Sequence, residues 1–325
     1  MAITRRDLLV FGSGLTAGAG YLAWSRRPAT PGSRLAGPGG PSGSTYAHGA
    51  IPPLDLGPLS LDPVTIPPPR FSDHLPATRR HDLQVVNQQI GVSVVGVMPA
   101  WTFGGSVPGP IIRATEGDTI QVNLANQTDR AHNIHFHGRH EIGADGWEPV
   151  PPGGKATYRI TAGPFGVHPY HCDFTPNEDH IANGLYGMMI VDPRGGRPPA
   201  REFALVLGGF DTDGDGKADI FGWNGVAGFF AKYPLKVTAG ELVRVYLANM
   251  AITEPAASFH LHAETFDVFR SGTSLTPTER TDIVTLGPAE RAIVEFRLPA
   301  RGRYMFHPHQ KTMAEHGAMG WFTAV

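Results

Sequence analysis

The stretch EGDTIQVNLAN, residues 116–126, alternates apolar and polar side chains over its second half. This period of two is typical of a strand with one buried face. A second stretch, AGELVRVYLANM at 239–250, repeats the Gly-acidic pair before the strand and the Leu-Ala-Asn near its end. Each stretch is followed by two histidines that are separated by one residue. The sequence therefore predicts one domain that occurs twice.

Short alternating runs in the rest of the chain indicate an all-β protein. Gly-, Pro- and Asp-rich turns separate these runs, and no amphipathic helix longer than a couple of turns is evident. Two consecutive β-sandwich domains account for this pattern. A junction is expected in DPRGGRPPAR at 192–201, which gives a first domain at 71–196 and a second at 197–325.

The N-terminal 27 residues are expected to be an export signal. Arg5 and Arg6 form a twin arginine, and the apolar run after them is too short and glycine-rich for a comfortable membrane span. This pattern predicts Tat export to a periplasmic or extracellular location. An uncleaved signal that stays as a membrane anchor is the alternative. Residues 28–70 are dense in Pro, Gly and Ser, and are expected to form a linker or a surface arm.

The charge composition excludes two classes of partner. The formal net charge is −2, and the basic residues are scattered along the chain. Binding to nucleic acid would need a clustered basic patch, and binding to an anionic membrane would need a polybasic segment. We therefore expect neither partner.

Cys172 is the only cysteine, and it directly follows His171 in HPYHCDF, residues 168–174. A lone thiol cannot form an intrachain disulfide, so it is either a buried inert residue or a thiolate ligand. His132 upstream and His180 downstream complete the His₂Cys set of a blue-copper electron-transfer site. A structural zinc site usually has four closed ligands with more than one Cys, and is less favoured.

Four histidine clusters occupy matching positions in the two halves. Because residues i and i+2 of a strand point to the same face, each His-x-His pair places two imidazoles side by side. A solvated strand face would explain one such pair but not four clusters in symmetric positions. The clusters can converge only where domains meet. They are His135/His137, HPYHC, His260/His262 and MFHPHQ.

Residues 85–325 resemble the two-domain multicopper oxidases, or small laccases, whose mononuclear copper lies in the first domain. The resemblance implies two cupredoxin-like Greek-key β-sandwiches. The stretches that carry it are GSVPGPIIRATEGDTIQVNLAN, HNIHFHG, ADGWEPVPPGG, YHCDFTPNEDHIANGLYG, FHLHAETFDVFRSG and GRYMFHPHQKTMAEHGAMGWF.

The resemblance also implies the copper ligands. His132, Cys172 and His180 match the type 1 site. The trinuclear ligands would be His135 and His260 for type 2 copper, with His137, His171, His262, His307 and His309 for type 3. Ala257 and Pro308 stand where a second type 1 site would need its ligands, so that site is absent. Five further histidines are expected at the surface or beside the ligands: His48, His74, His81, His140 and His168.

Two positions depart from the family pattern. Asp173 stands where relatives usually have a histidine, which leaves seven trinuclear imidazoles. Its carboxylate either offers a harder oxygen ligand or leaves one type 3 copper weakly bound. Leu185 stands at the axial type 1 position, where many relatives have Met. Met188 could supply the axial sulfur instead, but it is more simply explained as a core residue of a strand. Asp145 matches the family's proton-relaying acid near type 2 copper, although an ordinary Asp-Gly turn also explains it.

The resemblance implies a laccase-like oxidase. Phenolic or other small reductants would each give one electron near an exposed His180, and O₂ would be reduced to water. A copper nitrite reductase, which shares the fold but keeps a mononuclear type 2 copper, is the first alternative, and a non-catalytic copper-binding protein is the second. The short linker between the domains favours a homotrimer whose sites are shared between neighbouring chains.

An acidic loop, DTDGDGKAD at 211–219, resembles part of a calcium-binding loop. Its carboxylates stand at positions 1, 3, 5 and 9, but position 12 is Gly222 in place of the bidentate Glu. A plain hairpin loop is therefore favoured over a calcium site. The four acidic residues are Asp211, Asp213, Asp215 and Asp219.

Overall fold

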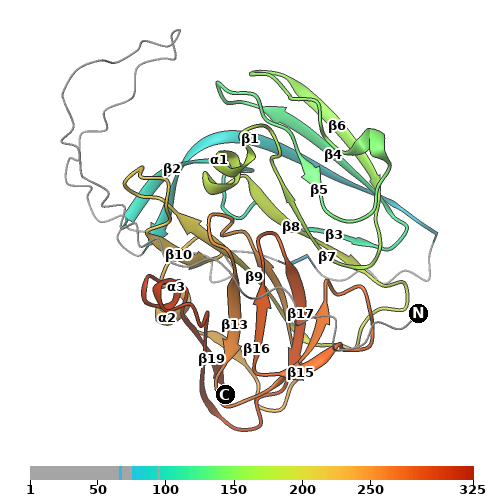
Figure 1. Cartoon of the computed structure of the whole chain (residues 1–325). Helices are drawn as coiled ribbons and strands as arrows, with labels where there is room; N and C mark the ends of the chain where they lie inside the picture. Colours follow the sequence, from blue (N-terminus) through green and yellow to red (C-terminus); the bar gives the residue numbers. More distant parts are fainter. Residues whose placement is uncertain (1–65, 68–74, 94–95) are drawn as a thin grey trace, which may run out of the picture. The chain divides into compact units, whose positions relative to one another are not determined.

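The computed structural model describes residues 66–67, 75–93 and 96–325, and it confirms the all-β prediction. Strands dominate, and the helices are short (Figure 1). The expected export signal and nearly all of the expected arm lie outside the described residues. Within the described ranges, no helix is long and apolar enough to cross a membrane.

The first half contains two four-stranded sheets, with strand orders β2-β1-β4-β6 and β3-β8-β7-β5. A 3-10 turn, η1 (Ile142–Ala144), follows β5, and helix α1 (Asn177–Ala182) lies between β7 and β8. The strands are β1 (Thr78–Ser93), β2 (Gly96–Phe103), β3 (Ile112–Thr115), β4 (Thr119–Asn126), β5 (His135–Phe136), β6 (Lys155–Thr161), β7 (Gly166–His171) and β8 (Tyr186–Asp192).

The second half contains sheets of order β10-β9-β12-β17-β14-β15 and β11-β19-β18-β13-β16. Its helices are α2 (Phe229–Lys232) and α3 (Lys311–Glu315). Its strands are β9 (Arg201–Phe210), β10 (Ile220–Trp223), β11 (Leu235–Val237), β12 (Val243–Asn249), β13 (Ala257–Leu261), β14 (Phe266–Arg270), β15 (Glu279–Thr281), β16 (Ile283–Leu286), β17 (Arg291–Phe296), β18 (Gly302–His307) and β19 (Gly320–Ala324).

The strand pairing agrees with the predicted duplication. In the first half β1 runs parallel to β4, which pairs antiparallel with β6. In the second half β9 runs parallel to β12, which pairs antiparallel with β17. The two similar stretches of sequence form the equivalent strands β4 and β12. In β4 the alternating residues Ile120, Val122 and Leu124 are fully buried, as their period of two requires.

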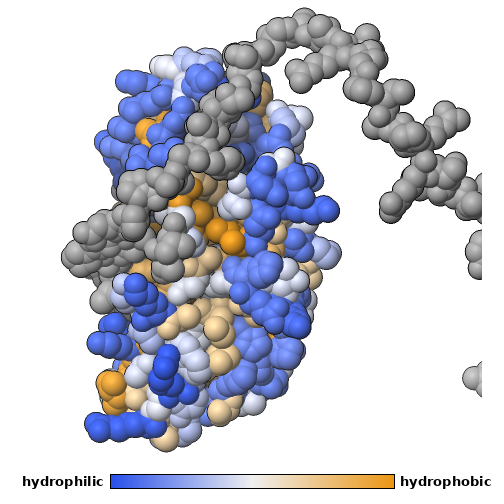
Figure 2. All heavy atoms as spheres, turned by 90° about the vertical axis from the view of Figure 1, so that its left-hand side faces the viewer, coloured by the Kyte–Doolittle hydropathy of each residue, from blue (hydrophilic) through white to orange (hydrophobic). Residues whose placement is uncertain are grey.

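Each half has its own hydrophobic core, and a third core joins them. The first core contains Cys172 and Leu185, whereas the joining core contains Met188 of β8 together with side chains of β9, β12 and β17. A smaller cluster lies where β1 and β2 meet β9. The face shown in Figure 2 is mostly hydrophilic at its two ends and has a hydrophobic patch near its middle.

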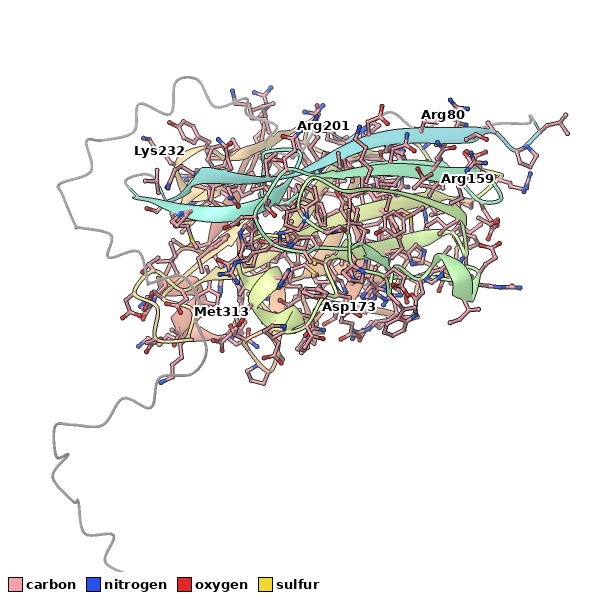
Figure 3. All side chains as sticks on the ribbon, turned by 90° about the horizontal axis from the view of Figure 1, so that it is seen from above. Arg80, Arg159, Asp173, Arg201, Lys232 and Met313 are labelled. Atoms are coloured by element: carbon pink, nitrogen blue, oxygen red, sulfur yellow. The ribbon has the colours of Figure 1, made fainter. Side chains whose placement is uncertain are left out.

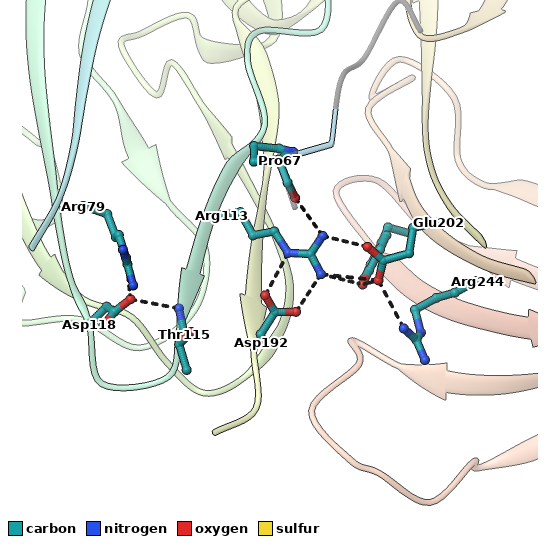
Figure 4. A network of polar contacts seen from close by, with 9 residues as sticks. Pro67, Arg79, Arg113, Thr115, Asp118, Asp192, Glu202 and Arg244 are labelled. Atoms are coloured by element: carbon teal, nitrogen blue, oxygen red, sulfur yellow. Dashed lines mark hydrogen bonds and ion pairs between the residues drawn. The ribbon is translucent and has the colours of Figure 1, made fainter. Parts of the chain in front are cut away.

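A buried network of charged side chains also joins the two halves (Figure 4). Arg113 of β3 contacts both carboxylate oxygens of Asp192 at 2.8 Å and donates to Glu202 of β9 at 2.7 Å. Glu202 also accepts from Arg244 at 3.1 Å and from the Tyr246 hydroxyl at 2.6 Å. Since buried charges need such partners, this network fixes β3 and β8 against β9 and β12.

Candidate metal centres

His132, Cys172 and His180 converge on one buried point, as predicted. Their ligand atoms lie within 4.8 Å of one another. The two Nδ1 atoms are 3.0 Å apart, and Sγ lies 3.2 Å from His180 Nδ1 and 3.9 Å from His132 Nδ1. This thiol and two imidazoles form the donor set that a type 1 copper ion requires.

Three short segments bring these ligands together. His132 is held by reciprocal backbone hydrogen bonds with Val150, Cys172 directly follows β7, and His180 lies in α1. His180 is only 5% exposed, which corrects the expectation that it is exposed. The indole of Trp101 covers it, with ring centroids 4.9 Å apart, and Phe174 contacts it edge-on at 5.7 Å.

Burial keeps this ligand set uncharged when no metal is bound. It raises the pKa of the Cys172 thiol to about 11, although the backbone N–H of Asn133 acts in the opposite direction. It also lowers the pKa of His132 to about 4, and the nearby His180 adds to this effect. A copper ion would therefore meet two neutral imidazoles and displace one proton from the thiol.

Leu185, which is predicted at the axial position of the type 1 site, lies in the same hydrophobic core as Cys172. The backbone N–H of Cys172 donates to the Leu185 carbonyl at 3.0 Å, and both side chains are fully buried. Met188 belongs to the core between the two halves, which agrees with its interpretation as a core residue.

His135, His137 and His171 form a second group of ligand atoms within 4.8 Å. His135 of β5 stands opposite His171 of β7 in the sheet register, and the Nε2 atoms of His137 and His171 are 3.0 Å apart. The Nδ1–H of His171 donates to the Cys172 carbonyl at 3.0 Å. Burial, followed by the charges of His171 and His135, lowers the pKa of His137 to about 3. Burial also lowers the pKa of His171. The imidazoles of His137 and His171 are therefore neutral at physiological pH.

The second half repeats this arrangement with His260, His262 and His307. His260 stands opposite His307 in the register, and the Nε2 atoms of His262 and His307 are 3.0 Å apart. The Nδ1–H of His307 donates to the Pro308 carbonyl at 2.8 Å, as His171 does to Cys172. His309 packs against His260, with ring centroids 4.8 Å apart.

The two histidine groups remain separate in one chain. Among the described residues, no set of ligand atoms within 4.8 Å combines histidines of both halves. His262 and His309 are exposed. The two groups are therefore separate candidate sites in one chain.

Asp145 lies beside His135, as predicted. Its Oδ1 accepts from His135 Nδ1 at 2.8 Å and lies 3.2 Å from His140 Nε2. The next residue must be glycine, because Gly146 has φ +78° and a Cβ there would come 1.9 Å from the Ile134 carbonyl oxygen. His140 was expected only at the surface or near the ligands, and no motif indicated its contact with Asp145.

Asp173 does not join either histidine group. Its Oδ1 accepts a hydrogen bond from Asn177 Nδ2 at 2.9 Å, and its backbone N–H donates to Asn133 Oδ1 at 2.7 Å. Figure 3 shows Asp173 beside α1 at the edge of the molecule in that view. Asn133, which sequence analysis missed, also donates its backbone N–H to the Cys172 sulfur at 3.5 Å.

The acidic loop brings Asp211, Asp213 and Asp219 within 4.8 Å. Asp215 instead accepts from the backbone N–H of Lys217. The carboxylate of Asp211 accepts hydrogen bonds from three backbone N–H groups of its own loop, at 2.6–3.2 Å. These bonds hold the loop without a metal, and calcium binding stays the less favoured alternative to a plain hairpin loop.

Comparison with known proteins shows the family of this chain. Profiles of the multicopper oxidase family match residues 86–196 and 207–325. A copper-containing nitrite reductase of Neisseria meningitidis serogroup A is 32% identical over 277 residues, which cover 78% of this chain and 71% of that protein. A crystal structure of a multicopper oxidase is 38% identical with a TM-score of 0.74, covering 76% of this chain and 89% of that one. The copper nitrite reductase of Nitrosomonas europaea is 29% identical with a TM-score of 0.70, covering 76% and 94%. The chain therefore belongs to the multicopper oxidase family, as a two-domain cupredoxin-like copper oxidoreductase.

Proposed function

We propose that this protein is a laccase-like oxidase that takes single electrons from phenolic or other small reductants and reduces O₂ to water. The supporting observation is the pair of three-histidine groups at equivalent registers, one on each sandwich. Together with His309 they offer seven imidazoles, which is more than one mononuclear copper would use.

Thiolate and imidazole donors suit copper in all the proposed sites. Bound there, copper supplies one-electron transfer from the reductant to O₂. Cys172 and His171 are adjacent in sequence, and the His171 Nδ1–H also donates to the Cys172 carbonyl. The type 1 ligand set is thus connected to the second histidine group by both a covalent path and a hydrogen bond.

Asp145 is proposed to hold and pass on protons. Its carboxylate fixes the His135 ring through Nδ1, which leaves Nε2 free to face the metal. His140 contacts the same Oδ1 from the other side, next to a cavity of about 700 Å³ that His140, Arg139 and Glu141 help to line. This cavity offers water a route to the Asp145–His140 pair.

The two separate histidine groups lead us to propose a homotrimer as the active form. A closed ring would place His135, His137 and His171 of one subunit against the second-half histidines of the next. The exposure of His262 and His309 in one chain is consistent with this assembly. Light scattering is expected to find three chains in the copper-loaded enzyme, and an active, fully metallated monomer would exclude the trimer.

Oxygen uptake with a phenol, measured beside nitrite consumption with a reduced mediator, tests the proposed reaction. We expect four phenol oxidations for each O₂ consumed, with little nitrite turnover. Nitrite consumption without O₂ uptake would favour the second candidate, a copper nitrite reductase. Asp173 favours that candidate, because an aspartate stands where the trinuclear set would have an eighth imidazole, and its Oδ1 accepts from Asn177. Copper binding without either reaction would indicate a non-catalytic copper protein.

Export by the Tat route to a periplasmic or extracellular location is also part of this proposal. It rests on the twin arginine, Arg5 and Arg6. Replacing both with lysine is expected to keep the protein in the cytoplasm, and unchanged export would argue against the Tat route.

A further inference from the structure

The three type 1 ligands lie on three separate segments, so other contacts must set their distances. Two of these segments are joined by Asn133, the neighbour of His132. Its Oδ1 accepts from the Asp173 backbone N–H at 2.7 Å, and its own backbone N–H donates to the Cys172 sulfur at 3.5 Å. The segments that carry His132 and Cys172 are thereby fixed to each other.

The third ligand, His180, lies in α1, which has only six residues. A helix this short has little stability of its own, so its position depends on outside contacts. Its N-cap residue, Pro176, makes no side-chain cap hydrogen bond. Instead Asn177, the first residue of α1, donates from Nδ2 to Asp173 Oδ1 at 2.9 Å. His180 follows three residues later and therefore lies on the same side of the helix as Asn177.

We propose that Asp173 is a positioning residue for the type 1 copper set and does not replace the missing imidazole of the trinuclear set. Its backbone N–H binds the His132 segment, and its carboxylate holds the helix of His180. The chain Asn133–Asp173–Asn177 thus connects all three ligand segments. The buried Ile181 anchors the C-terminal end of α1, which leaves the Asn177 end to be fixed by Asp173.

No described group of potential ligand atoms includes Asp173. This distinguishes its carboxylate from that of Asp145, which lies within such a group. The inference rests on the type 1 assignment made above, but it is independent of whether O₂ or nitrite is the oxidant. It explains the aspartate at position 173, where relatives usually have a histidine, by a role at the type 1 site.

Four variants of the copper-loaded full chain test this inference: Asp173→Ala, Asp173→Asn, Asn177→Ala and, as a control, Glu178→Gln. Glu178 is exposed in the same helical turn, and its change removes a charge without touching the link. The readouts are the thiolate-to-copper absorption, the electron paramagnetic resonance of the type 1 copper, and copper per subunit after dialysis against a chelator. Circular dichroism of each variant confirms that it is folded.

Asp173→Ala and Asn177→Ala are expected to weaken type 1 copper retention by a few-fold, up to about tenfold, because the bond they remove is exposed and touches no ligand side chain. Both should change the blue band in the same way. A fifth protein that combines Asp173→Ala with Asn177→Ala should be no worse than either single variant, because both changes remove one shared bond. Asp173→Asn keeps Oδ1 as an acceptor and should stay close to the control. If Asp173→Ala keeps the blue band and loses copper only from the trinuclear set, the carboxylate is a ligand there and the inference is wrong. An unaltered Asn177→Ala spectrum would also overturn it. A wild-type protein with no blue band would instead refute the type 1 assignment itself.

Discussion

Replacing Arg113 with methionine should weaken the connection between the two domains (Figure 4). The Arg113 side chain is only 4% exposed and pairs with Asp192 and Glu202, which are themselves 5% and 15% exposed. Methionine fills much of the same volume but leaves the two carboxylates without their main counter-charge. Removing one partner of a buried pair typically costs about 3–5 kcal/mol. We expect a loss of that size in the free energy of unfolding at pH 7.

The loss should depend on pH with a definite sign. Burial acts to raise the pKa of Glu202, but hydrogen bonds from Arg113, Tyr246 and Arg244 outweigh it and hold this pKa below its ordinary value of 4.5. A carboxyl with a lowered pKa contributes stability above its unfolded pKa and loses it as the pH falls through the folded value. The difference between wild type and Arg113→Met should therefore be full at pH 7 and shrink below about pH 4.3.

Thermal unfolding followed by calorimetry measures this effect. For a chain of this size each kcal/mol shifts Tm by about 2 °C, so a decrease of roughly 6–10 °C is expected. Arg280→Ala is the matched control, because the Arg280–Asp267 pair is exposed and should contribute less than about 1 kcal/mol. A further change, Glu202→Gln, should recover part of the loss in Arg113→Met. If Arg113→Met lowers Tm no more than the control, the network does not hold the domains together.

Three other predictions concern the metal sites. Cys172→Ser should bind copper without the intense blue absorption, because the thiolate-to-copper transition needs this one sulfur, and a variant that stays blue would contradict the type 1 assignment. Asp145→Asn should keep the blue band and copper content but lower O₂ reduction by roughly 10–100-fold, whereas unchanged turnover would mean that Asp145 is only a turn residue. Millimolar calcium should leave Tm unchanged, since backbone N–H groups already occupy the carboxylate of Asp211, and a higher Tm would indicate a calcium site.

The fold could be predicted because its main signals are local. The period of two in residues 116–126 follows directly from the geometry of a strand with one buried face, and the matching stretch at 239–250 shows the duplication. The joining core was not predictable in this way. Met188 packs there and not beside Cys172, although both residues lie in or next to neighbouring strands. A strand that is buried on both faces has apolar residues on both, so its sequence does not show which face packs against which core. Tertiary packing decides this.

The candidate ligands could be predicted because His-x-His and His-Cys place donor atoms by backbone geometry alone. Their surroundings could not. Trp101 covers His180 from β2, a strand far away in sequence, and thereby removes the exposure expected for this histidine. Asp173 was expected near the trinuclear set because a histidine usually stands there. A carboxylate can turn instead to a nearby amide donor, and Asn177 supplies one four residues later.

The duplicated imidazoles and the single thiol together assign different roles to the two domains. His171 and His307 occupy equivalent registers, and each donates its Nδ1–H to the carbonyl of the next residue. In the first domain that residue is Cys172, whose sulfur lies in the type 1 set. In the second it is Pro308, which has no side-chain donor atom for a metal. The same hydrogen bond therefore connects a group of one thiol and two imidazoles to the histidine group in one domain only. Under the proposed function, electrons enter through the first domain, and the second contributes ligands for the oxidant.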